Sequence, residues 1–135
     1  MKRMILIVLC LLPVFFVEAQ ETKPISGPVI TWAESTYDFG DIMEGDKVSH
    51  TFKFTNTGNS PLVLTNVEVT CGCTTPNGWP RDPIAHGATG ELTVAFNSTG
   101  KSGKQHKVIN IVSNSVGTTN QVMIMVNVLA KKQSN

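Results

Sequence analysis

The sequence predicts an all-β protein, an antiparallel β-sandwich of about seven strands. Apolar and polar residues alternate along several short segments, which is the period of a half-buried strand. Turn residues separate these segments, and none of them shows the 3.6-residue apolar period of a helix. The roughly 100 residues that carry the pattern suit a single two-sheet core.

Each expected strand follows from this alternation. In residues 47–56 one face is apolar apart from a single histidine, and it carries Val48, His50, Phe52 and Phe54. In residues 62–71 the expected apolar face holds Val63, Val67, Val69 and Cys71, and Thr65 interrupts it. The other expected strands are 29–32, 35–42, 91–97, 105–114 and 121–130.

The last expected strand is apolar on both faces. Val122, Ile124, Val126 and Val128 share one face. Met123 and Met125 lie on the other, which predicts either a covered position at the centre of a sheet or a surface that meets a partner. A soft-metal site is a further interpretation of these methionines, although methionine more often fills gaps in a core.

The N-terminus has the pattern of a secretory signal peptide. Lys2 and Arg3 precede an apolar run from Met4 to Val17 that is too short to span a membrane. We expect cleavage after Ala19 and export to the periplasm or the extracellular space, with no integral membrane span in the mature chain. The expected organisation is a signal peptide at 1–19, a linker at 20–28, a sandwich domain at 29–130 and a polar tail at 131–135.

The charge balance makes nucleic acid an unsuitable partner. The whole chain has 11 Lys and Arg and 10 Asp and Glu, and loss of Lys2, Arg3 and Glu18 with the signal leaves nine of each. A mature chain of zero net charge is a poor candidate for binding phosphates or anionic membranes.

One long segment resembles a known family. The residues YDFGDIMEGDKVSHTFKFTNTGNSPLVLTNVEVTCGCTTP resemble the signature of a bacterial family of exported immunoglobulin-like domains of unknown function. That family is distantly similar to the ASH/hydin and major-sperm-protein-like sandwiches. The similarity covers about residues 31–130, and its most specific parts are Phe39-Gly40, FKFTNTG and CGCTTP. His86-Gly87 stands where proline-glycine is more usual, which affects the rigidity of one turn. The resemblance implies an immunoglobulin-like fold and export, and it implies no activity.

Enzyme chemistry needs a nucleophile, a base and a stabilising group that converge. The three histidines are dispersed: His50 in a strand, His86 in a turn and His106 at the start of another strand. The acidic residues of the loop Asp38, Asp41, Glu44 and Asp46 fit no calcium-loop spacing. Gly100-Lys101-Ser102 ends like a phosphate-binding loop, but no helix follows, so a hairpin turn explains it better. We therefore expect no enzyme activity and no cofactor.

Cys71 and Cys73 carry the remaining chemical alternatives. In an extended strand, residues two apart lie about 6.6–6.8 Å from each other, the upper limit for a disulfide, and Gly72 permits a tighter bend. The pair is then a structural disulfide, a pair of packed thiols, a thiol-redox site or a soft-metal site. Zinc needs two more ligands than the pair supplies.

The function that these observations predict is an exported, non-catalytic interaction or structural module of the cell envelope with a protein partner. The candidate contact residues are Trp79 and Arg81 in the loop after the cysteines, and Met123 and Met125 on the last strand. The alternative is a periplasmic thiol-redox or copper-handling protein that uses Cys71 and Cys73.

Overall fold

The computed structural model describes residues 13–18, 26–117 and 120–131. Most of the expected signal peptide, its cleavage site after Ala19, most of the expected linker and the tail from 132 lie outside the described residues. Residues 13–18 are exposed and form no secondary structure. No helix in the described ranges is long and apolar enough to cross a membrane.

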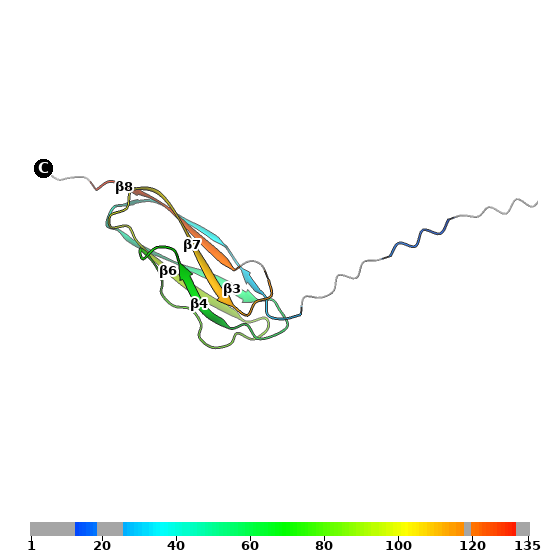
Figure 1. Cartoon of the computed structure of the whole chain (residues 1–135). Coiled ribbons are helices and arrows are strands. Elements are labelled where there is room, and N and C mark those ends of the chain that lie inside the picture. The colour runs from blue at the N-terminus through cyan, green and yellow to red at the C-terminus, as the bar shows by residue number, and fades with distance from the viewer. Residues whose placement is uncertain (1–12, 19–25, 118–119, 132–135) are drawn as a thin grey trace, which may run out of the picture.

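The described chain forms two four-stranded sheets packed face to face, which confirms the all-β, immunoglobulin-like sandwich (Figure 1). The first sheet has the order β1-β3-β6-β5, with bounds Ile30–Trp32, Lys47–Asn56, Thr89–Asn97 and Thr74–Pro76. The second sheet has the order β2-β8-β7-β4, with bounds Thr36–Met43, Gln121–Leu129, Gly103–Ser113 and Leu64–Val69. All neighbouring strands are antiparallel except β2 and β8, which pair in parallel.

The described residues hold one strand more than the seven expected. The additional strand is β5, a three-residue strand inside the segment that the sequence indicated as a loop. It follows Cys73 directly and pairs with β6 at the edge of the first sheet. β5 has only three residues, one of which is Pro76, so it does not show the alternation of apolar and polar residues that identified the other strands.

The expected apolar face of β3 is confirmed and supplies much of the core. Phe52 and Phe54 are fully buried, and opposite them in register on β6 lie Leu92 and Gly90. The phenyl ring of Phe54 occupies the space above Gly90, where an added Cβ would lie 2.5 Å from the ring. Each buried phenylalanine contributes about 1.5–3 kcal/mol of hydrophobic stabilisation.

The inward face of β4 differs from the expectation. Leu62, just before the strand, and Leu64 are buried, whereas Val63 is half-exposed. The pairing with β7 shifts between Leu64 and Asn66, which marks a β-bulge, and Val67 then returns to the core. A bulge adds one residue to a strand and so reverses the alternation on one side of it.

The connection from β6 to β7 is also not the expected hairpin, because it crosses from the first sheet to the second. The buried Ser98 anchors it: its hydroxyl donates to the carbonyl oxygens of Met43 at 3.0 Å and Asp46 at 2.7 Å. The turn around residues 98–102 is thereby fixed to the β2–β3 turn.

Candidate functional site

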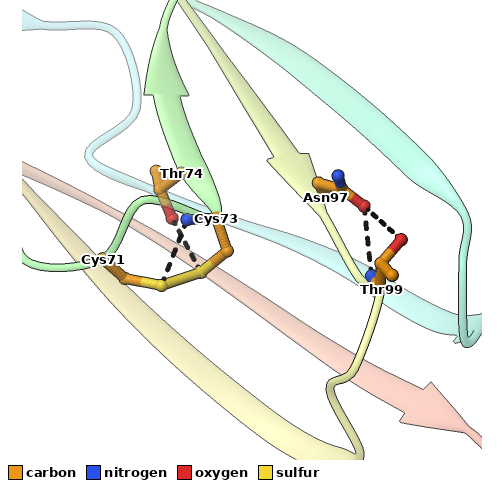
Figure 2. The surroundings of a disulfide bond; sticks show 5 residues. All are labelled: Cys71, Cys73, Thr74, Asn97 and Thr99. Carbon is orange, nitrogen blue, oxygen red and sulfur yellow. Dashed lines mark hydrogen bonds between the residues drawn. A yellow bond between two sulfur atoms is a disulfide. The ribbon is translucent and has the colours of Figure 1, made fainter.

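Cys71 and Cys73 form a disulfide at the point where the chain changes sheets (Figure 2). β4 ends at Val69 in the second sheet, and β5 begins at Thr74 in the first. The two Cα atoms are 5.3 Å apart, closer than in an extended strand, because the chain bends at Gly72. This bend is a β-turn in which the N–H of Thr74 donates to the carbonyl of Cys71 at 3.1 Å.

The rest of the turn is attached to the first sheet. The N–H of Asn97, at the end of β6, donates to the carbonyl of Cys73 at 2.8 Å. The N–H of Cys73 faces the sulfur of Cys71 at 3.2 Å. The side-chain oxygen of Asn97 accepts bonds from the N–H and the hydroxyl of Thr99, which shapes the next turn (Figure 2).

The disulfide shows which of the alternatives for Cys71 and Cys73 fit this structure. In this form neither sulfur is a thiolate, so the pair is not a metal ligand set, and packed free thiols do not describe it either. Both residues are half-buried, and Cys73 packs against the core. Within the described ranges, no group of three or more His, Cys, Asp and Glu residues is placed to hold a metal ion. A structural disulfide and a redox-active disulfide both fit this geometry.

Trp79 and Arg81 lie together in the loop between β5 and β6. Trp79 packs against the hydrophobic core and is half-buried. The guanidinium carbon of Arg81 stands 3.6 Å from the centre of the indole ring, a cation–π contact. The indole therefore caps the core, and Arg81 covers its outer side.

Met123 and Met125 lie on the outer face of β8, the strand between β2 and β7, and both are half-buried. In register, Met125 has Asp38 of β2 on one side and His106 of β7 on the other. A shallow pocket of about 270 Å³ is lined here by Asp38, Gly40, Asp41, Lys104, His106, Met125, Val126 and Asn127. The charged residues around Met125 were not predicted as a group, because they come from two other strands whose register the sequence does not show.

His50 joins the two sheets at the seam between β3 and β2. Its ring stacks on Tyr37 with centroids 3.6 Å apart and planes 8° apart, and it meets Phe39 and Phe52 edge-on. Its Nε2 pairs with the carboxylate of Glu34, which is partly exposed. His50 thus lies at the boundary between the two sheets, on the otherwise apolar face of β3, and its partner is the side chain of Glu34.

The other candidate polar groups hold turns. The Nδ1 of His86 contacts the carbonyl of Gly58, and the 85–88 turn closes with a bond from the N–H of Ala88 to the carbonyl of Ala85. Of the four acidic residues expected in one loop, Asp38 and Asp41 lie on β2, and all four accept hydrogen bonds from within the chain. These bonds join Asp38 to the Gly40 N–H, Asp41 to Asn127, Glu44 to the Gly100 N–H and Asp46 to the Met43 N–H.

The FKFTNTG signature has a structural explanation. The buried amide of Asn56 donates to the carbonyl oxygens of Ser60 at 2.8 Å and Ile84 at 2.9 Å, and its oxygen accepts from the N–H of Gly58 at 3.1 Å. At Gly58 an added Cβ would lie 2.1 Å from the carbonyl oxygen of Gly27, so only glycine fits against that backbone.

Solved structures with the same fold come from different biological settings. A protein of unknown function from Porphyromonas gingivalis W83 has a TM-score of 0.65 at 17% identity over 82% of this chain and 51% of that chain. The PapD-like domain 7 of human CEP192, an ASH/PapD-like domain, has a TM-score of 0.57 at 10% identity over 82% of this chain and 94% of that chain. The secreted serine protease VesC from Vibrio cholerae has a TM-score of 0.55 at 21% identity over 76% of this chain and 23% of that chain.

At these identities the likeness concerns the fold alone. This chain spans about half of the Porphyromonas protein and about a quarter of the protease. No curated protein sequence matches this chain. A family model does match, over residues 30–128, which is most of the sandwich. The chain belongs to the family described as protein of unknown function (DUF1573).

Proposed function

We propose that this protein is an exported, non-catalytic interaction module of the bacterial cell envelope. The observation that carries the proposal is that polar side chains singled out in the sequence make contacts that hold the sandwich together. Asn56 of the FKFTNTG signature and the histidines His50 and His86 make contacts that hold turns and the seam between the two sheets. Function on such a scaffold belongs to its surfaces and strand edges.

Two further features support export. The N-terminal sequence has the charge and apolar pattern of a secretory signal. The Cys71–Cys73 disulfide suits an oxidising compartment, where such bonds persist.

The test has two parts. Mass spectrometry of the protein isolated from its native cells should show a mature chain that begins at Gln20 in the envelope fraction. Cross-linking in intact cells should then capture the same protein partner in replicate experiments, whereas an unrelated sandwich domain exported by the same signal should not. A protein that stays in the cytoplasm with its signal attached, or one that gives the same cross-links as the control domain, contradicts the proposal.

The second candidate is a thiol-redox function of the Cys71–Cys73 pair, and the observed disulfide favours it over the copper-handling form. In such a reaction the disulfide accepts two electrons and two protons from a dithiol donor and becomes two thiols. Equilibration with glutathione buffers, followed by alkylation, measures its reduction potential. A value near that of the oxidising compartment supports a redox role, whereas a pair that stays oxidised in all buffers contradicts it. Copper or zinc in stoichiometric amount after anaerobic purification would instead support metal handling.

A further inference from the structure

β7 has an open backbone edge beside the disulfide turn. β8 pairs with β7 from Gly103 to Asn110, but β4 pairs with β7 only from Ile109 to Ser113. In the part of the chain that the structure describes, no strand pairs with the other side of residues Gly103–Lys107, which we call the β7 edge.

The edge is open because the chain bends away at the disulfide. If β4 continued in its register, Gly72 would lie opposite His106, and Thr74 opposite Lys104. Instead, Thr74 pairs with Phe96 in the first sheet. The place of a longer β4 is therefore left free along the start of β7.

The direction of the backbone groups along this edge follows from the hydrogen bonds of β7. The N–H of Ile111 donates to the carbonyl of Asn120 at 2.7 Å, on the β8 side. Since successive residues of an antiparallel ladder direct their backbone groups to opposite sides, Lys104 and His106 direct theirs to the open edge. The β7 edge thus offers two N–H donors and two carbonyl acceptors to an incoming strand.

The side chains around the edge are basic. Lys104 and His106 are exposed on the outer face, and Lys107 is half-buried on the other. No residue from 98 to 110 is acidic. Asp38 and Asp41 of β2 line one pocket with Lys104 and His106, on the β8 side and away from the open edge, and the exposed Glu68 of β4 lies opposite Asn110.

The basic side chains at the β7 edge favour one kind of incoming strand and oppose another. Lysine on an exposed edge opposes pairing with another copy of the same edge, because like charges would face each other. An extended segment with carboxylates at alternate positions places them beside Lys104, whose ammonium group attracts them, and beside His106, whose ring N–H can donate a hydrogen bond.

We propose that the β7 edge binds an extended acidic segment of a protein partner as an added strand, and this inference rests on the proposed function as an interaction module. The segment takes the line of β4, antiparallel to β7, and makes four backbone hydrogen bonds with Lys104 and His106. Its acidic side chains lie on the outer face of the second sheet.

The direct test uses the isotopically labelled mature chain and the synthetic peptide Thr-Thr-Glu-Thr-Glu-Thr-Thr. On titration, the backbone amide signals of Lys104 and His106 should shift and their hydrogen exchange should slow. The amides of Gln105 and Lys107, which face β8, should keep their exchange rates. A peptide with lysine in place of both glutamates is the matched control and should not bind.

Two variants make the test specific. The double variant Lys104→Glu/His106→Glu should keep its melting temperature within a few degrees and bind the acidic peptide at least tenfold more weakly. The matched control Lys131→Glu, outside the sandwich, should bind like the original chain. Shifts confined to another edge, no shifts at all, or protection of Lys104 and His106 before any peptide is added would overturn the inference; the last result would mean that another segment of the chain covers the edge.

A failure of this inference is distinguishable from a failure of the proposed function. If the original chain and Lys104→Glu/His106→Glu capture the same envelope partner equally well, the β7 edge is not the binding site, but the interaction function stands. If the original chain captures no specific partner in cells, the proposed function fails whatever the peptide does.

Discussion

The disulfide between Cys71 and Cys73 closes the turn through which the chain passes from the second sheet to the first. It encloses only the residue Gly72, so it removes little freedom from the unfolded chain. The chain-entropy relation gives about 1.6 kcal/mol for a three-residue loop, against 2–4 kcal/mol for typical disulfides.

We therefore predict that Cys71→Ser/Cys73→Ser stays folded and lowers the free energy of unfolding by about 1–2 kcal/mol. Urea denaturation followed by fluorescence measures the change. The original chain denatured in the presence of a reductant is the control and should lose a similar amount. A variant that is unfolded in buffer would show that the turn depends on the disulfide far more than its loop length implies.

The two glycines at Gly72 and Gly58 should respond in opposite ways to alanine. An added Cβ at Gly72 meets nothing within 4 Å, and Gly72 is not among the glycines with a positive φ. Gly72→Ala should therefore change the free energy of unfolding by less than about 1 kcal/mol, with a gain favoured by the stiffer unfolded chain.

Gly58→Ala, the matched variant, places its Cβ 2.1 Å from the Gly27 carbonyl oxygen and 2.5 Å from the Val29 nitrogen. Since backbone atoms must move apart, we expect a loss of more than about 3 kcal/mol or failure to fold. Denaturation curves of the two variants give the comparison, and equal effects would contradict the close approach at Gly58.

The buried Asn56 gives a third prediction. Asn56→Ala leaves the buried N–H of Gly58 without its partner and removes one bond each from the carbonyls of Ser60 and Ile84, of which Ile84 keeps its bond from the N–H of Leu62. An unsatisfied buried group costs about 1–3 kcal/mol, so a loss of about 1–3 kcal/mol is expected in thermal or urea denaturation. The exposed Asn66, at the β4 bulge, is the control: Asn66→Ala should cost less than about 1 kcal/mol. Similar losses at both sites would show that Asn56 is not the anchor of the turn.

The alternation of apolar and polar residues predicted the regular strands. The features that it missed depend on pairing between strands that are far apart in the chain. The faces of β3 and β8 follow directly from alternation at Phe52 and Val126. Thr65 interrupted the expected apolar face of β4, but its role as the extra residue of a bulge depends on the pairing with β7, which the sequence does not show. The parallel pairing of β2 with β8 joins residues far apart in the chain, so no local pattern reports it.

The residues of the candidate site were predicted from the sequence, but their arrangement was not. Its residues Cys71, Cys73, Trp79 and Met125 were singled out from their types and spacing. The sequence left two geometries open for the cysteine pair, an extended strand with about 6.6–6.8 Å between the Cα atoms and a tighter bend at Gly72. The structure has the bend, with 5.3 Å between the Cα atoms. The β7 edge was missed because it exists only through the departure of β4 from the second sheet.

Proline substitutions test which backbone groups of β7 face that open edge. Proline has no N–H, so it is tolerated where the N–H points to solvent and is harmful where the N–H belongs to the ladder. Lys107 lies opposite Ile124 and directs its N–H to β8, whereas His106 directs its N–H to the open side. Lys107→Pro removes a ladder hydrogen bond to β8 and should lower the free energy of unfolding by about 1–3 kcal/mol, and His106→Pro by clearly less. Urea denaturation of the two variants decides the order. A larger loss for His106→Pro would mean that the N–H of His106 is already bonded in the free protein, and the β7 edge would then have no donor at this position for an incoming strand.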